Sequence, residues 1–239
     1  MPGEVLIIRN VPRENPGLIE VILNQENIDF KVVDFEDNSR FPVLDRLRAV
    51  IVLGGPESAN DKTPKMLNEL AFIRSVIEAG IPFLGICLGL QTLVKSMGGS
   101  VLRCRIPETG FRDNKGDLYR VKLTAEGEAD SLLAGLPGEF VVFQLHGETV
   151  LLSPEMSLLG TGDNCMNQII RIGKNAYGFQ FHFELTDDLL KSWMSEDADL
   201  QKADHDMLLN DYRLLKADYH KTGGLIIANF LAISGKSDN

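Results

Sequence analysis

Short apolar runs alternate with segments of helical periodicity along the first hundred residues of the chain. The runs at 5–8, 30–34, 49–53 and 81–84 have the length and the apolar composition of buried strands. Between them, apolar residues recur three or four positions apart, which predicts amphipathic helices. Because strands alternate with helices, the pattern predicts an α/β fold with a mainly parallel central sheet that helices cover on both faces.

The segment after the third run shows how such a helix is delimited. Thr63 and Pro64 have the form of an N-cap and a first helical residue, and Gly80 stands where the helix should end. The face expected to point inward consists of Met66, Leu67, Leu70, Ile73 and Ile77.

The pattern changes after about residue 100. Short strands without helices are expected at 100–105, 117–123, 139–146, 157–160, 168–172 and 176–183, as an antiparallel addition to the parallel sheet. Helices are then expected at 186–195, 199–220 and 224–233. No repeat, low-complexity tract or proline-rich linker divides the chain. We therefore expect one domain over residues 1–185 and a helical extension over 186–239 that packs on the same domain.

The stretch Gly85-Ile86-Cys87-Leu88-Gly89 stands where the fourth strand turns into a helix. A cysteine between two glycines at such a turn has the form of a nucleophile elbow, with sulfur in place of a hydroxyl. The glycines permit a sharp turn, and the helix N-terminus favours a negatively charged sulfur. Cys87 is therefore the predicted nucleophile, and an inert core cysteine is the alternative.

A cysteine nucleophile requires a base, and the chain has four histidines. His205 and His220 fall in the charged C-terminal segment and are expected at the surface. His182 and Glu184 are two residues apart on the last expected strand, so their side chains share one face and can act as a base and its orienting carboxylate. His146 is the rival base, because Glu148 follows it at the same distance.

Composition restricts the functions that such a site can serve. The formal net charge of −10, with no basic patch, argues against binding to nucleic acid or to an anionic membrane. The three cysteines, Cys87, Cys104 and Cys165, show neither metal-ligand spacing nor a disulfide framework, so we expect no metal and a reducing compartment. The first residues lack the features of a signal peptide, and no apolar run reaches the length of a membrane span, which predicts a cytoplasmic protein.

Three motifs, taken in order, resemble those of the class I glutamine amidotransferases, which use a catalytic triad. They are Gly54-Gly55-Pro56-Glu57-Ser58, Gly85-Ile86-Cys87-Leu88-Gly89-Leu90-Gln91 and Gly178-Phe179-Gln180-Phe181-His182-Phe183-Glu184, and with His146-Gly147 they span nearly all of residues 1–185. The likeness is to the amidotransferase domain of GMP synthase and its free-standing relatives. It implies a flavodoxin-like fold in which Cys87 attacks the side-chain amide of glutamine and forms a γ-glutamyl thioester. It also implies that His182 moves the proton and that Glu184 orients His182.

The same resemblance implies the rest of the site. The N–H groups of Gly55 and Leu88 would form the oxyanion hole, with Leu88 also expected from the analogy with hydrolase elbows. The Gln91 side chain and the backbone near Leu145, Gly147 and Glu148 would hold the substrate, and no cofactor is expected. Two features depart from the family: Glu148 stands where aspartate is frequent, and residues 186–239 extend past the usual end of the domain.

Three functions remain open from the sequence. The favoured one is hydrolysis of glutamine to glutamate and ammonia. Since the sequence has no P-loop and no Ser-Gly-Gly-x-Asp-Ser-like motif, either a separate synthetase uses the ammonia or the enzyme is a free hydrolase without an ammonia acceptor. The second is a γ-glutamyl peptidase with the same triad, because both substrates share one acyl part. The third is a non-enzymatic regulatory or interaction module on this fold, against which the intact Cys87, His182 and Glu184 weigh. The oligomeric state is not determined by the sequence.

Overall fold

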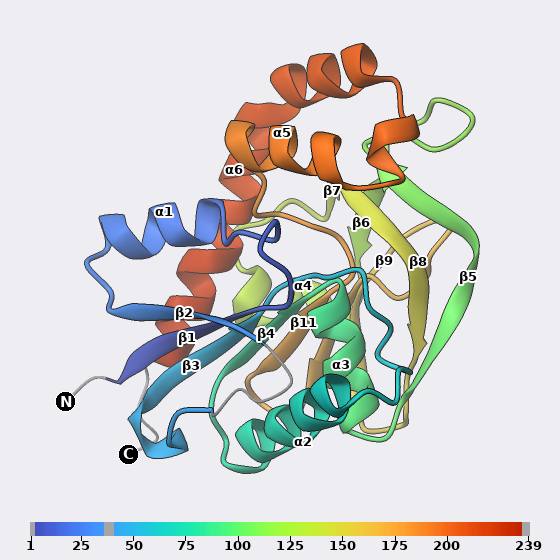
Figure 1. The fold of residues 1–239 in the computed structure, drawn as a ribbon. Coiled ribbons are helices and arrows are strands. Elements are labelled where there is room, and N and C mark those ends of the chain that lie inside the picture. Colours follow the sequence, from blue (N-terminus) through green and yellow to red (C-terminus); the bar gives the residue numbers. More distant parts are fainter. Residues whose placement is uncertain (1–2, 36–40, 236–239) are drawn as a thin grey trace.

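The computed structural model describes residues 3–35 and 41–235, and its centre is a mixed β-sheet (Figure 1). Nine strands of the described residues form this sheet in the order β2-β1-β3-β4-β11-β10-β9-β6-β7. The parallel half consists of β1 (Glu4–Arg9), β2 (Phe30–Asp34), β3 (Leu47–Val52), β4 (Phe83–Ile86) and β11 (Ala176–Phe179). The antiparallel half consists of β10 (Ile169–Ile172), β9 (Met156–Thr161), β6 (Arg120–Leu123) and β7 (Glu139–Val141). The predicted fold class is thus confirmed.

Helices cover both faces of the parallel half, and the alternation of side chains along β1 shows why. Val5 and Ile7 enter a core shared with α1 (Leu18–Gln25) and α6 (His205–Ser234). Leu6 and Ile8 enter a second core, shared with α2 (Pro64–Glu78) and α3 (Leu88–Ser96). Successive residues of a strand point to opposite faces, so one apolar run fills both cores.

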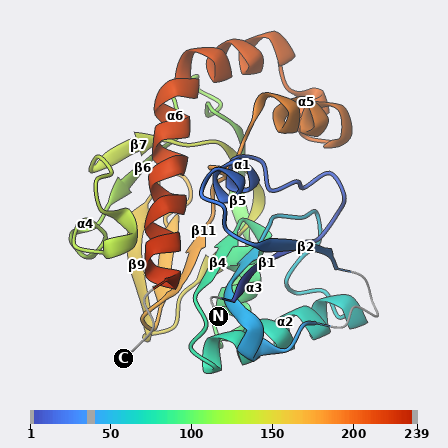
Figure 2. The same ribbon diagram turned by 90° about the vertical axis from the view of Figure 1, so that its left-hand side faces the viewer.

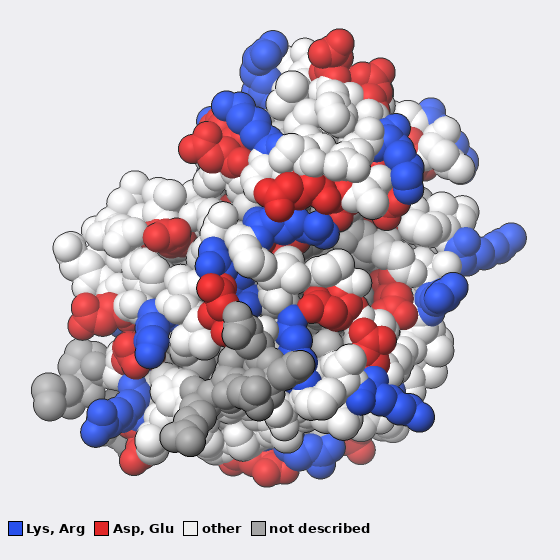
Figure 3. All heavy atoms as spheres, viewed as in Figure 1, with Lys and Arg blue, Asp and Glu red and all other residues white. Residues whose placement is uncertain are grey.

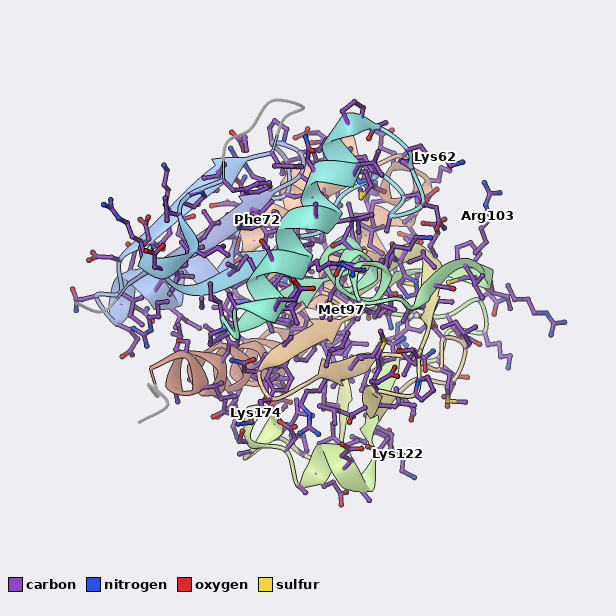
Figure 4. All side chains as sticks on the ribbon, turned by 90° about the horizontal axis from the view of Figure 1, so that it is seen from below. Lys62, Phe72, Met97, Arg103, Lys122 and Lys174 are labelled. Atoms are coloured by element: carbon purple, nitrogen blue, oxygen red, sulfur yellow. The ribbon has the colours of Figure 1, made fainter. Side chains whose placement is uncertain are left out.

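The view from below shows α2 lying across the sheet, with Lys62 and Arg103 at the periphery (Figure 4). Phe72 of α2 is buried in the core between helix and sheet. Thr63 caps this helix, because its side-chain oxygen accepts a hydrogen bond from the Met66 N–H at 3.2 Å. The predicted inward face was wrong at one position, since Leu67 is 55% exposed. Glu69 occupies a buried position on that face instead.

Three predicted segments differ from the structure. The expected strand at 139–146 is two strands, β7 and the start of β8 (Gln144–Leu151), and β8 pairs with β5 (Ser100–Gly110) in a separate two-stranded sheet. The expected strand at 176–183 ends at Phe179. The segment that was expected to lack helices contains a short one, α4 (Ala125–Glu128).

The two helices predicted at 199–220 and 224–233 are one helix, α6, which begins at His205 (Figure 2). Gly223 does not break it. A Cβ atom there would lie 2.4 Å from the Phe183 carbonyl oxygen, so this glycine lets the helix approach the chain that follows β11. The preceding helix, α5 (Asp187–Glu196), packs with α6 in a third apolar cluster that includes Phe111, Phe143 and Trp193. Within residues 3–35 and 41–235, no helix combines the length and the hydropathy that a membrane span requires.

Candidate active site

Cys87 lies in the turn between β4 and α3, and β4 lies between β3 and β11 in the sheet. Its backbone has φ 52° and ψ −103°, a conformation that side-chain-bearing residues rarely adopt. The flanking glycines allow close backbone contacts: a Cβ on Gly85 would lie 2.3 Å from the Gly89 oxygen, and a Cβ on Gly89 would lie 2.2 Å from the Val52 oxygen. The elbow predicted from the sequence is therefore formed, and its glycines are sterically required.

His182 and Glu184 form a buried pair beside this elbow. The His182 Nδ1 donates a hydrogen bond to the Glu184 Oε1 at 2.6 Å, and the second Glu184 oxygen accepts from the Phe183 N–H at 2.8 Å. The charge of Cys87 also acts on the His182 ring and raises its pKa. A Cβ on Gly54 would lie 3.1 Å from the His182 Cε1 and 3.7 Å from the Cys87 Cβ, so both side chains converge on that glycine. The two residues follow β11 and do not belong to the strand, and His182 forms an isolated antiparallel bridge with Phe143.

The electrostatics of this pair favour a protonated imidazole. Burial by itself lowers the pKa of His182, but the charge of Glu184 and the hydrogen bonds with Cys87 and Glu184 together raise the pKa well above its ordinary value. Both side chains are about 2% exposed, so water screens these interactions little. The arrangement therefore stabilises an imidazolium next to the Cys87 sulfur.

The residues expected to form the oxyanion hole are neighbours. A Cβ on Gly55 would lie 2.9 Å from the Leu88 Cδ2, and Gly55 lines the same cavity as Cys87. Leu88 is the first residue of α3, where a backbone N–H has no acceptor within the helix. Gly55 thus borders the cavity that contains the sulfur, and Leu88 directly follows Cys87 in the chain.

The expected substrate-holding residues line the same cavity as Cys87. Gln91 is buried, and its Nε2 donates to the Glu148 carbonyl oxygen at 3.2 Å. The Leu145 carbonyl oxygen lies 3.5 Å from the Cys87 Sγ. Together with Gly147, these residues line a cavity of about 790 Å³ that contains Cys87 and His182. A smaller cavity of about 440 Å³ beside α6 has neither a cysteine nor a histidine in its lining.

Comparison with known proteins identifies the family that has this arrangement. The family model of the class I glutamine amidotransferases matches residues 18–197, which is more than half of the chain. The chain belongs to the class I glutamine amidotransferase family. This confirms the family and the class of enzyme predicted from the sequence.

Similar proteins include glutamine-hydrolysing GMP synthases. That of Leifsonia xyli subsp. xyli is 30% identical over 165 residues, which cover 68% of this chain and 31% of the relative. That of Borreliella burgdorferi is 29% identical over 200 residues, which cover 81% of this chain and 36% of the relative. The chain thus spans about a third of the length of these curated relatives.

Solved structures of similar size share the whole fold. A glutamine amidotransferase from Thermotoga maritima has a TM-score of 0.85 and 28% identity, with 99% of this chain and 100% of that chain covered. A glutamine amidotransferase from Methylobacillus flagellatus has a TM-score of 0.86 and 25% identity, with 100% and 98% covered. The C-terminal helices are therefore within the shared architecture.

Glu14 and Arg13 were not predicted from the sequence as residues of the cavity. Glu14 is buried in the loop after β1, and burial, opposed by the charge of His182, raises its pKa to about 7. Arg13 lies 3.6 Å from Glu14 and 3.1 Å from Asp197, so it connects this loop to the end of α5. No spacing rule could have found either residue, because their proximity to Cys87 depends on the tertiary fold.

The C-terminal helices contact the His182 segment directly. The Trp193 ring lies 4.7 Å from the His182 ring, edge to face, and its Nε1 donates to the Arg13 carbonyl oxygen. The Tyr219 hydroxyl donates to the His182 carbonyl oxygen at 2.9 Å. His220, expected at the surface, is half-buried with its Nε2 3.0 Å from the Leu185 carbonyl oxygen. The extension thus helps to position the imidazole in this amidotransferase.

His146, the rival base, has other partners. Its Nε2 lies 2.9 Å from Glu108 and its Nδ1 lies 3.0 Å from the Glu148 carbonyl oxygen. Both ring nitrogens are thus engaged outside the Cys87–His182 pair. The histidine that contacts the elbow cysteine in the structure is His182.

Proposed function

We propose that this amidotransferase hydrolyses the side-chain amide of glutamine to glutamate and ammonia through a γ-glutamyl thioester on Cys87. The observation that carries the proposal is the buried His182–Glu184 hydrogen bond of 2.6 Å, with the same imidazole and the cysteine of a strained elbow converging on Gly54. A thiol, a base and an orienting carboxylate in this order are the parts that acyl transfer requires.

The reaction begins when the Cys87 sulfur attacks the amide carbon of glutamine. A sulfur–carbon bond forms, and the negative charge on the oxygen is stabilised by the N–H groups of Gly55 and Leu88. The His182 imidazolium gives its proton to the amide nitrogen, the carbon–nitrogen bond breaks and ammonia leaves. Neutral His182 then takes a proton from water, whose oxygen attacks the thioester. The sulfur–carbon bond breaks and glutamate is released.

Binding of the substrate is assigned to the opposite wall of the cavity. The Gln91 side chain and the backbone of Leu145, Gly147 and Glu148 would hold the amino-acid end of glutamine. Around the hollow beneath α5 (Figure 3), Glu57, Glu148, Glu196, Asp197 and Asp199 outnumber Arg13 and Arg103 in the lining of the cavity. Their negative potential suits the α-ammonium group of an amino acid.

The test is hydrolysis of glutamine, measured as ammonia released, together with mass spectrometry of the chain after treatment with a diazo-ketone analogue of glutamine. We expect Cys87 alone to be labelled, and we expect Cys87→Ser and His182→Ala to abolish most turnover. His146→Ala should mainly raise KM, because its loop is assigned to binding. The assignment of Cys87 as nucleophile would be overturned by equal labelling of all three cysteines. The assignment of His182 as base would be overturned by turnover that survives His182→Ala and is lost in His146→Ala.

A second activity, γ-glutamyl peptide hydrolysis, is favoured by the size of the cavity. The cavity of about 790 Å³ extends from Cys87 to Asp199 and is larger than free glutamine needs. A leaving group larger than ammonia would then fit. A panel of glutamine, γ-glutamyl dipeptides and glutathione decides between the two, because a peptidase would show higher kcat/KM on the dipeptides.

We also propose that the ammonia is used by a synthetase. The support is that the similar curated proteins are glutamine-hydrolysing GMP synthases, of which this chain matches about a third. When the chain is mixed with an ammonia-using GMP synthetase subunit, glutamine should sustain GMP formation. GMP formation that responds to ammonium salts but not to glutamine would contradict this partner assignment.

A further inference from the structure

Cys104, His146 and Cys165 form a cluster that the proposed reaction does not use. Cys104 lies on β5, His146 on β8 and Cys165 in the turn between β9 and β10. The two cysteine Sγ atoms and a ring nitrogen of His146 all lie within 4.8 Å of one another. In residues 3–35 and 41–235, this is the one group of three or more histidines, cysteines or acidic residues with metal-ligand proximity.

The geometry fits a tetrahedral cation. The Cys104 Sγ and the His146 Nδ1 are 3.5 Å apart. Zinc bonds of about 2.3 Å to sulfur and about 2.0 Å to nitrogen, at a tetrahedral angle, also place these atoms about 3.5 Å apart. Two cysteines and one histidine are a donor set that zinc prefers.

A buried carboxylate prepares the histidine for this role. Glu108 is 2% exposed, and its Oε2 lies 2.9 Å from the His146 Nε2. Without metal, the Nδ1–H donates to the Glu148 carbonyl oxygen at 3.0 Å. When that proton leaves and Nε2–H donates to the Glu108 carboxylate, the Nδ1 lone pair can bind a cation beside the Cys104 sulfur. Carboxylates that hold the outer nitrogen of a metal-binding histidine in this way are a regular part of zinc sites. Gln168 holds Glu108 in turn, with its Nε2 at 3.4 Å from the same oxygen.

The surroundings leave a fourth coordination position on one side. Cys104 and His146 line the cavity that contains Cys87, whereas Cys165 lies behind them and is 4% exposed. A metal ion held by the three residues would therefore have its remaining position open toward the cavity, where water can complete the coordination.

We propose that Cys104, His146 and Cys165 bind a thiophilic divalent cation, with zinc as the best fit, in the wall of the cavity. Binding replaces the proton of each thiol by a metal–sulfur bond and the Nδ1 proton of His146 by a metal–nitrogen bond, and these protons pass to the solvent. It also takes the His146 Nδ1 away from the Glu148 carbonyl oxygen, which lies 3.0 Å from it and accepts the Gln91 side chain as well. On the proposed function, zinc would thus weaken glutamine binding.

The test measures metal binding in the Cys87→Ser protein under a phosphine reductant, so that the elbow thiol and disulfides play no part. Zinc is titrated against a chromophoric chelator, and cobalt is used as a spectroscopic probe of tetrahedral thiolate coordination. We expect one metal per chain. Glu108→Gln should weaken binding by about 10- to 100-fold, Cys165→Ser should weaken it more, and His205→Ala, a histidine outside the cluster, should not change it.

Alkylation gives a readout that needs no further variant. In Cys87→Ser, zinc should slow the alkylation of Cys104 and Cys165 together. The proposal would be overturned if Cys87→Ser bound no zinc, if Cys165→Ser bound zinc as tightly as before, or if zinc protected only one of the two thiols. Because Cys87→Ser cannot form the thioester, these results do not depend on whether the chain hydrolyses glutamine.

Discussion

Glu69 on α2 makes the stability of this protein depend on pH. Its side chain is fully buried, and neither carboxylate oxygen has a hydrogen-bond partner among the described residues. Burial raises the pKa of Glu69 to about 7 from an ordinary value of 4.5, with Asn10 and Lys65 opposing and Glu57 reinforcing the increase. The folded state therefore binds a proton on Glu69 more tightly than the unfolded state does.

The sign and size of the effect follow from this difference. A carboxyl whose pKa is raised by folding contributes its full stability below about pH 4.5 and loses it as the pH rises toward 7. At about 1.4 kcal/mol for each pH unit, the interval from 4.5 to about 7 corresponds to a loss of about 3 kcal/mol in the free energy of unfolding. A glutamine side chain at this position carries no ionisable group, so Glu69→Gln should remove this loss.

Urea unfolding at several pH values between about 4.5 and 8 measures the effect. The free energy of unfolding of Glu69→Gln, relative to the unmodified protein, should rise by about 3 kcal/mol across this range. Glu78→Gln, at an exposed position of the same helix, controls for the loss of a carboxyl group. A difference between Glu69→Gln and the unmodified protein that stays constant with pH would refute the reasoning.

Three further outcomes are expected. Glu184→Gln should lower kcat by about 10²- to 10⁴-fold. Because Glu184 helps to raise the pKa of His182, the basic limb of the pH–rate profile should also move to lower pH, and an unchanged profile would contradict this. Gly89→Ala should destabilise the fold by about 1–3 kcal/mol in urea unfolding, since its Cβ would lie 2.2 Å from the Val52 oxygen; a neutral effect would show that the elbow can relax. Tyr219→Phe removes the hydrogen bond to the His182 carbonyl oxygen, so it should lower the free energy of unfolding by about 1–2 kcal/mol and also lower kcat. If both the free energy of unfolding and kcat were unchanged, α6 would not position the imidazole.

The sequence by itself determined the features that depend on local chemistry. Gly85 and Gly89 marked the strand-to-helix turn because only glycine allows its close backbone contacts. His182 and Glu184 could be paired because residues two apart on a strand share one side, and the structure pairs them although β11 ends at Phe179. The parallel half of the sheet followed from apolar runs that are buried on both faces.

Only the tertiary structure decided which distant segments meet. Gly223 reads locally as a helix breaker, but it lies inside α6 because the helix passes Phe183 too closely for a side chain. Glu14 reaches the cavity, and Cys104 reaches Cys165, through packing that no periodicity encodes. Local patterns report the conformation of neighbouring residues, whereas contacts between remote residues depend on how all the elements fill one core.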